Sequence, residues 1–263
     1  MKKTLLVFTV IITLFLAGCV KTDDDLNSLE KVQEQGYLIL GLDDTFAPMG
    51  FRDEDGEVVG FDIDLAKAVS LELGVELRIQ PIEWDSKTLE LNAGNIDMIW
   101  NGLSITPARE ESILFSAPYL SNNQIVLVRE GFSLEELSDL NGLKVGVQID
   151  SSGQSALQGS DVYSSIDEMI QFDTFVEAVM DLTAGRIDAI VVDEINARYV
   201  VELNQYAVEV TNVSLGAEQY GIGFRLDDVE LRDEIDSILD ALVTAGTTTT
   251  ISNTWFGEDI FRK

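Results

Sequence analysis

Apolar and polar residues alternate along most of the chain in blocks that have the lengths of strands and helices. Residues 62–74 place Ile63, Leu65, Ala66, Val69 and Leu73 at a helical spacing and end at a glycine. Apolar runs at 38–42, 79–82, 96–100, 145–147 and 189–192 have the length of buried strands. Strands that alternate with helices predict an α/β fold, in which mostly parallel sheets are flanked by helices.

One pattern occurs twice along the chain. "LNAGNIDMI" (91–99) and "LTAGRIDAI" (182–190) share the form L-x-A-G-x-I-D-x-I. In each copy a helix is predicted to end on a glycine that suits the left-handed position after a helix, and a strand follows. The interval is too long for a solenoid repeat, so it predicts two similar lobes. Asp97 and Asp188 are expected to be structural residues inside the two strands.

The first residues have the pattern of a secretory signal. Lys2 and Lys3 precede an apolar run at 5–17, which is shorter than the about 20 residues that a membrane span needs. "LAGC" resembles the lipobox of bacterial lipoproteins, in which cleavage before the cysteine frees it for lipid attachment. We therefore expect a signal peptide at 1–18, a lipid on Cys19 and a polar tether over 19–29. An ordinary signal with an incidental cysteine is the alternative.

Composition excludes several classes of function. The chain has 17 Lys+Arg against 47 Asp+Glu, a net charge of −30, which would repel nucleic acid. This acidity either keeps the protein soluble or draws in cationic ligands. With no histidine and one cysteine, metal sites of the His/Cys type and nucleophile systems of the Ser-His-Asp or Cys-His type are excluded. We expect no cofactor and no metal.

Polar and aromatic side chains follow the predicted strands. Ligands of parallel α/β sheets bind outside the carboxyl ends of the strands, so these residues are candidates for a site. They are Asp43, Asp44, Phe46, Glu83, Trp84, the stretch "NGLSITPARE" (101–110), Gln148, Asp150, Ser151, Ser152 and Asp193.

The stretch 101–110 favours an anion site. Thr106 is placed to cap a helix that has Pro107 at its first position, which puts Arg109 in the first turn. An anion there would meet backbone N–H groups, the hydroxyl groups of Ser104 and Thr106, and a guanidinium suited to a carboxylate. The alternative is a surface arginine that pairs with a neighbouring glutamate, either Glu110 or Glu111.

A series of motifs resembles one family. "GFDIDLAKAV", "NGLSITPARE", "FSAPYL", "VGVQIDSSG", "LTAGRIDAIVVDE", "YGIGFR" and "WFGEDI" resemble, in this order, the polar amino acid substrate-binding proteins of bacterial ABC importers. The resemblance covers nearly all of the mature chain. It implies a two-lobe, periplasmic-binding-protein-like fold whose lobes, joined by two crossover strands, close over one amino acid. Lobe 1 would be 30–120 plus 221–263 and lobe 2 would be 121–220, with crossovers near 119–124 and 217–221.

The same resemblance assigns roles to single residues. Arg109 would hold the ligand α-carboxylate, together with Ser104 and a backbone N–H near Ser152. Asp193 would bind the α-ammonium beside the Gly102 carbonyl. Phe46 and Trp84 would pack on the ligand side chain, and Asp43 and Gln148 would meet its far end. Asp150 departs from the family, which usually has glycine there.

Each role has a simpler alternative. Phe46 and Trp84 could be core residues, Asp193 could cap the next helix, and Asp43 could be a turn residue. Gln148 is a polar residue at a strand end, which needs no ligand to explain it.

The resemblance implies a receptor outside the cytoplasmic membrane, anchored by lipid, monomeric, and partnered by the permease subunits of an ABC importer. Carboxylates in a closed cleft favour a cationic ligand such as arginine, lysine or ornithine, with glutamine next because Gln148 and Asp43 could satisfy an amide. Glutamate ranks last, since no second arginine or lysine occurs in the strand-end loops. The alternative is an enzyme similar to cyclohexadienyl dehydratase, a fold relative, for which Asp43, Glu83, Asp150 and Glu194 are candidates by location only.

Overall fold

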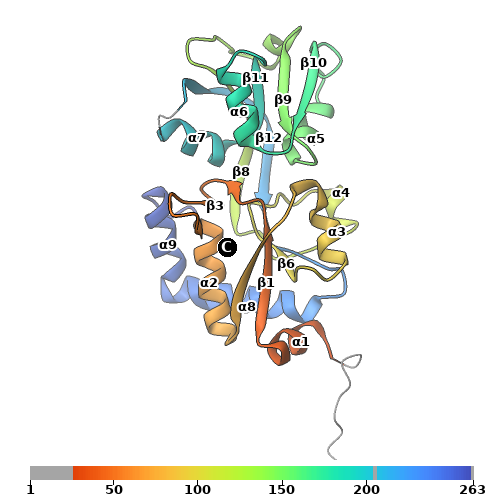
Figure 1. Cartoon of the computed structure of the whole chain (residues 1–263), viewed down its shortest axis with the longest axis vertical. Helices are drawn as coiled ribbons and strands as arrows, with labels where there is room; N and C mark the ends of the chain where they lie inside the picture. The colour runs from red at the N-terminus through yellow and green to blue at the C-terminus, as the bar shows by residue number, and fades with distance from the viewer. Residues whose placement is uncertain (1–25, 204–205, 262–263) are drawn as a thin grey trace, which may run out of the picture.

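The computed structural model describes residues 26–203 and 206–261 as two lobes stacked along the long axis of the molecule, with two strands running between them (Figure 1). The predicted signal peptide and the lipid site at Cys19 lie outside the described residues. Over the described ranges, no helix combines the length and the apolar composition needed to cross a membrane.

The lower lobe of Figure 1 is built on a mixed sheet in which the order is β5-β1-β6-β13-β7. Its strands β5, β1 and β6 are parallel, and β13 runs antiparallel to both β6 and β7. The bounds are β1 (Tyr37–Leu42), β5 (Glu76–Pro81), β6 (Met98–Ile99), β7 (Leu114–Phe115) and β13 (Gly223–Phe224). A small antiparallel sheet of β2 (Thr45–Phe46), β3 (Gly50–Arg52) and β4 (Val58–Val59) follows β1.

The second sheet has the order β10-β9-β11-β8-β12. Strands β10, β9 and β11 are parallel, whereas β8 and β12 are antiparallel to their neighbours. The bounds are β8 (Leu120–Arg129), β9 (Lys144–Gln148), β10 (Glu168–Phe172), β11 (Ala189–Asp193) and β12 (Val208–Tyr220). The predicted strand segments are thus found, but the run at 96–100 forms only the two-residue β6.

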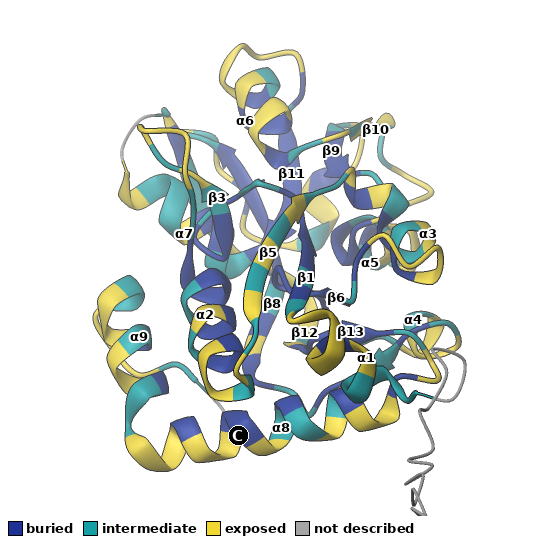
Figure 2. Cartoon of the chain, turned by 60° about the horizontal axis from the view of Figure 1, so that its bottom comes forward, coloured by how far each residue is buried: buried dark blue, intermediate teal, exposed yellow. Residues whose placement is uncertain are grey.

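Helices pack against the outer faces of the sheets. Each helix near a sheet buries one side and exposes the other, as Figure 2 shows for α2 and α8. The helices are α1 (Ser28–Gln35), α2 (Phe61–Leu73), α3 (Lys87–Asn92), α4 (Pro107–Glu110), α5 (Ser152–Gln158), α6 (Phe175–Thr183), α7 (Glu194–Glu202), α8 (Val229–Ala245) and α9 (Thr247–Phe256), with short 3₁₀ turns η2 (Trp84–Ser86) and η3 (Leu137–Leu140).

The two copies of the repeated pattern fold alike. Gly94 and Gly185 have φ angles of 76° and 73°, in the left-handed region where glycine is favoured, and each directly follows a helix. Asp97 then accepts a hydrogen bond from the Ile39 amide on β1 (2.9 Å), and Asp188 accepts one from the Lys144 amide on β9 (2.9 Å). The structural role is confirmed. Both residues lie just before a strand, β6 or β11, and not inside it, and each side chain accepts a hydrogen bond from a backbone amide of the neighbouring strand.

Two paired strands carry the chain between the sheets. The β8 strand leaves the first lobe and β12 returns to it, and they pair antiparallel from Leu120 opposite Tyr220 to Gln124 opposite Gly216. The pairing brings the start of one strand and the end of the other to the junction of the lobes. Side chains on this stretch therefore lie at the floor of the space between the lobes.

Candidate functional site

A small cavity lies between the lobes. All nine residues predicted for a ligand site line it: Asp43, Phe46, Trp84, Gly102, Ser104, Arg109, Gln148, Ser152 and Asp193. Asn101, Ser151 and Phe175 line it too; the first two were among the strand-end candidates without an assigned role, and Phe175 was not predicted. The residues converge because the carboxyl ends of the parallel strands of both sheets face one another here.

The helix start around Arg109 has the predicted geometry. Thr106 is the N-cap of α4, and its hydroxyl accepts a hydrogen bond from the Arg109 amide (3.3 Å). The guanidinium does not follow the surface alternative, because Nη1 donates to the Ser104 carbonyl (3.0 Å) and Nη2 donates to the Asp150 carbonyl (3.0 Å) in the other lobe. Burial lowers the pKa of Arg109, while the charges of nearby carboxylates raise it. An arginine nonetheless stays protonated at neutral pH.

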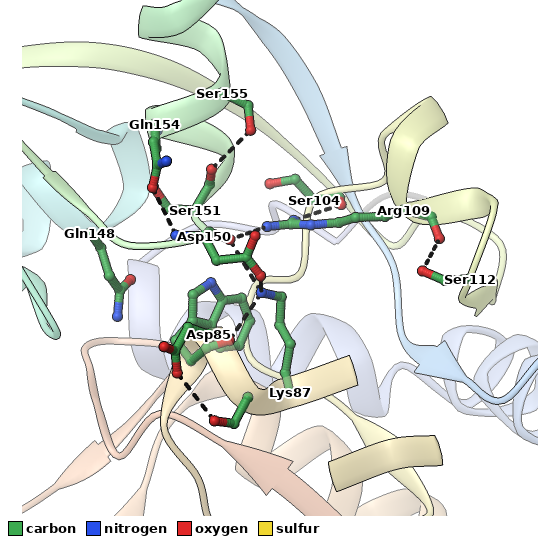
Figure 3. Close-up of polar contacts among 12 residues, drawn as sticks. Asp85, Lys87, Ser104, Arg109, Ser112, Gln148, Asp150, Ser151, Gln154 and Ser155 are labelled. Carbon is green, nitrogen blue, oxygen red and sulfur yellow. Dashed lines mark hydrogen bonds and ion pairs between the residues drawn. The ribbon is translucent and has the colours of Figure 1, made fainter. Parts of the chain in front are cut away.

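Asp150 and Lys87 form an ion pair across the lobes. Lys87 Nζ contacts Asp150 Oδ2 and also donates to the carbonyls of Asp150 (3.2 Å) and Trp84 (3.0 Å). Figure 3 shows the side chain of Lys87 reaching Asp150 from below and that of Arg109 reaching it from the right. Lys87 is 1% exposed, and its pKa is lowered to about 8, first by burial and then by the charge of Arg109, against the opposing effect of Asp150.

The backbone conformation at Asp150 explains why glycine suits this position. Its φ angle is 55°, in the left-handed region that glycine adopts freely and other residues adopt at a cost of order 1 kcal/mol or more. Aspartate is among the residues that tolerate this conformation best. The side chain of Gln154 accepts a hydrogen bond from the Asp150 amide (2.9 Å), so the strained turn is held from within its own lobe.

Asp193 is the last residue of β11 and lines the cavity. It occupies the N-cap position of α7, but its side chain makes no capping hydrogen bond there. Instead Oδ1 accepts hydrogen bonds from Asn122 Nδ2 (2.7 Å) and from the Tyr220 hydroxyl (2.6 Å). Burial and the charge of Glu218 raise the pKa of Asp193 well above its ordinary value. The capping alternative is therefore wrong for this side chain.

The opposite end of the cavity is closed by a contact between the lobes. Gln148 Nε2 donates to Asp43 Oδ2 (2.7 Å) and to the Asp173 carbonyl (2.9 Å). Asp43 Oδ1 also accepts from the amide (2.9 Å) and hydroxyl (2.7 Å) of Thr45, so Asp43 is a turn residue and a cavity residue at once. Burial raises the pKa of Asp43.

The two predicted aromatic residues are buried as well as cavity-lining. Phe46 packs against Phe175 of the other lobe, with ring centroids 5.8 Å apart. Lys87 Nζ lies over the Trp84 ring, 4.8 Å from its centroid, so the protein itself supplies one cation for this ring. Core packing and cavity lining are therefore not exclusive for these residues.

Gly102 is held in place by a buried carboxylate. Its amide donates to Asp62 Oδ2 (2.7 Å), which also receives the Tyr119 hydroxyl (2.9 Å). A Cβ at Gly102 would lie about 3 Å from the rings of Phe46 and Tyr220, so the backbone approaches the aromatic residues too closely for a side chain. Burial raises the pKa of Asp62 to about 7.

Three contributors were not predicted. Lys87 is a second cation beside the cleft. It is the first residue of α3, one helical turn beyond Trp84, and so lies outside the strand-end loops on which the low rank of glutamate was based. Glu218 reaches the cavity floor from β12, two residues before the "YGIGFR" motif, and Asp62 belongs to "GFDIDLAKAV". Sequence signals existed for the last two, since each carboxylate lies in or beside a recognised motif.

Comparisons with known proteins agree with this architecture. Residues 38–258 match the family model of bacterial extracellular solute-binding proteins, family 3. The L-cystine-binding protein TcyJ of Escherichia coli is 31% identical over 92% of this chain and 90% of its own length. The probable ABC transporter arginine-binding protein ArtJ of Chlamydia trachomatis is 31% identical over 97% of this chain and 96% of its own.

Solved structures give the same result for the fold. An ABC uptake transporter substrate-binding protein from Streptococcus pneumoniae, with bound histidine, superposes with a TM-score of 0.84 at 35% identity. The match covers 90% of this chain and 99% of that one. By its sequence, its two lobes and its interlobe cavity, this chain belongs to the bacterial extracellular solute-binding proteins of family 3.

Proposed function

We propose that the protein is the receptor of an ABC importer and binds a cationic amino acid, arginine, lysine or ornithine, in the cavity between its lobes. The α-carboxylate would meet Arg109 and the hydroxyl of Ser104, and the α-ammonium would meet Asp193 and the Gly102 carbonyl. Relatives that are named for binding arginine, cystine or histidine support an amino acid as the ligand class.

The balance of charge around the cleft carries the proposal of a cationic ligand. Among the described residues there, four carboxylates (Asp43, Asp150, Asp193 and Glu218) outnumber two cations (Lys87 and Arg109). The three donor positions of Lys87 are used by protein acceptors, so this lysine has no hydrogen to offer a ligand carboxylate. A guanidinium or ammonium at the Asp43 end would offset a carboxylate whose burial already raises its pKa.

The lobes are closed in this structure, and the polar groups at the cavity ends satisfy one another. A bound side chain would have to displace the hydrogen bond between Gln148 and Asp43, and its own donors would replace that bond. Arginine and lysine bring several donors to Asp43, whereas glutamine brings one amide group that suits both Asp43 and Gln148. Glutamine therefore remains the next candidate.

Cystine is a second candidate because TcyJ is similar over nearly the whole chain. It carries two carboxylates and would need a second cation, and Lys87 would have to exchange Asp150 for the ligand. Isothermal titration calorimetry with arginine, lysine, ornithine, glutamine, cystine and glutamate distinguishes these candidate ligands by their affinities. Tightest binding of glutamate or cystine would refute the charge argument.

Binding is favoured over catalysis. The carboxylates considered for an enzyme are engaged elsewhere: Asp43 by Thr45 and Gln148, Asp150 by Lys87, and Glu194 by Asn123 and Arg198. Glu83 is exposed. A turnover assay with cyclic carboxylic acids, run beside the titrations, tests this; product formation would support the enzyme alternative.

We further propose that the mature protein is a monomer anchored outside the cell membrane by a lipid on Cys19. The anchor would keep it near its permease at a high effective concentration. The paired strands β8 and β12 would act as the hinge between lobe 1 (30–120 plus 221–263) and lobe 2 (121–220). Small-angle scattering with and without ligand tests the hinge motion.

A further inference from the structure

Two carboxylates lie side by side at the junction of the lobes, and one of them, Asp193, lines the cavity. Glu218 on β12 pairs opposite Asn122 on β8, at the junction of the lobes. The Asn122 side-chain amide donates to Asp193 Oδ1 and to Glu218 Oε1, at 2.7 Å each. One amide nitrogen thus joins the two acids, because an oxygen of each carboxylate lies within hydrogen-bond distance of it.

The remaining donors to the pair are neutral. Glu218 Oε1 accepts from Ser104 Oγ (2.7 Å), Gln124 Nε2 (2.8 Å) and Ser152 Oγ (3.3 Å). Asp193 accepts from the Tyr220 hydroxyl. These donors come from the first lobe, the second lobe and both connecting strands, so the acids sit where any closure of the lobes would surround them.

Among the described residues, no lysine or arginine forms an ion pair or a hydrogen bond with the two acids. Arg109 on α4 is the nearby cation, but its guanidinium donates to the carbonyls of Ser104 and Asp150. Lys87 on α3 is engaged by Asp150 and Trp84, and Asp150 itself adds negative charge. Asp193 is buried and Glu218 is half-buried, and two adjacent carboxylates in this setting cannot both ionise cheaply, so one retains a proton until a cation replaces it.

We propose that Asp193 and Glu218 form a paired-carboxylate seat that holds a proton in the ligand-free protein and exchanges it for the ammonium group of the incoming amino acid. The proposal rests on the proposed function, in which the α-ammonium lies at Asp193, and it adds Glu218 as a second residue that contacts that group. The exchange balances in charge: one proton leaves to solvent as one ammonium enters. Burial and the neighbouring charge of Glu218 raise the pKa of Asp193 well above its ordinary value, the direction in which a carboxyl group keeps its proton.

The seat makes binding depend on pH in a defined direction. Protons compete with the ligand, so the affinity rises with pH by up to about tenfold per unit while the pair still holds its proton. The ligand α-ammonium stays charged over that range, so the slope reports the protein. A ligand whose α-amino group is acetylated cannot displace the proton and should bind weakly.

The decisive experiment is calorimetric titration of the tightest-binding amino acid in buffers that differ in ionisation enthalpy, near pH 6. Wild type is expected to release close to one proton for each ligand bound. Glu218→Gln keeps the shape and removes the like charge, so it should release little or none and should lose the pH slope. Glu209→Gln on the same strand, away from the cavity, is the matched control and should behave as wild type.

An infrared difference spectrum gives a readout that does not depend on a variant. The carbonyl band of a protonated carboxyl group should be present in the ligand-free wild type and disappear on binding. Amino acid binding with no proton release, or a Glu218→Gln variant that releases as many protons as wild type, overturns the seat and leaves the receptor function intact. If none of the amino acids binds, the receptor function itself fails, and the seat fails with it.

Discussion

The ion pair between Lys87 and Asp150 predicts how a single charge controls the closed form. We consider Asp150→Asn, which keeps the size of the side chain and the tolerance for a φ angle of 55° but removes the negative charge. Lys87 remains, and its ammonium is 1% exposed in the closed form. Its acceptor across the lobes becomes neutral, so the cost of burying the ammonium is no longer offset.

The expected size of this effect follows from the exposure of the two partners. Removing one member of a fully buried pair costs about 3–5 kcal/mol, whereas an exposed pair contributes about 0–1 kcal/mol. Asp150 is 60% exposed although Lys87 is buried, so the pair lies between these limits. We expect the closed form to lose about 1–3 kcal/mol relative to the open form, a factor of about 5–150 in their ratio.

Small-angle scattering of the ligand-free protein measures this ratio directly. Asp150→Asn should enlarge the radius of gyration, and a ligand at saturation should restore the compact form. Lys87→Met removes the buried charge, so Lys87→Met/Asp150→Asn should be nearly as compact as wild type. Asp161→Ala, an exposed aspartate of the same lobe, is the control. A ligand-free Asp150→Asn protein as compact as wild type would refute the reasoning.

Three further predictions concern other parts of the chain. Arg109→Ala should weaken amino acid binding about 30-fold or more by calorimetry, because a charge-assisted contact in a closed cleft is lost, and Arg109→Lys should not restore it fully. Wild-type affinity of Arg109→Ala would argue against a contact between Arg109 and the ligand α-carboxylate. Burial raises the pKa of Asp62 to about 7, so the native state keeps a proton that the unfolded chain releases above about pH 4. The free energy of unfolding of wild type therefore falls from about pH 4 to 7. The stability of Asp62→Asn relative to wild type should rise over that range, by about 1.4 kcal/mol for each unit by which the two pKa values differ. Denaturant unfolding measured at several pH values tests this, and a stability difference between variant and wild type that does not change with pH would contradict it. Cys19→Ser should leave the signal uncleaved or release the protein from membranes in fractionation, and unchanged processing with membrane retention rules out the lipid anchor.

Local signals explain why much of the fold was predictable. Gly94 and Gly185 mark the ends of two helices, and this signal is contained in a few neighbouring residues. The motifs likewise place polar residues directly after strands. Parallel strands present their carboxyl ends at one edge, so residues such as Asp43 and Gln148 meet without any further information.

The unpredicted contributors depend on contacts between distant segments. Lys87 looks like a solvated residue at a helix start, yet its side chain is 1% exposed and pairs with Asp150 of the other lobe. Glu218 faces the cavity because of the register of β12 against β8, and a shift of one residue would turn it away. Asp62 has the pattern of a polar position in an amphipathic helix, yet it is buried under Tyr119. A local sequence pattern does not determine the closure of the lobes, the register of paired strands or the angle at which a helix packs.

The position of β13 in the first sheet has a consequence for the order in which the molecule is assembled during synthesis. Every strand of the second sheet lies within Leu120 to Tyr220, so that sheet can form as soon as this stretch has emerged. The first sheet, whose β1 is made much earlier, lacks the strand between β6 and β7 until Gly223 and Phe224 appear. Domains generally fold as units while the chain grows, N-terminal ones first. Here that order is reversed: the lobe whose synthesis begins first is the lobe completed last.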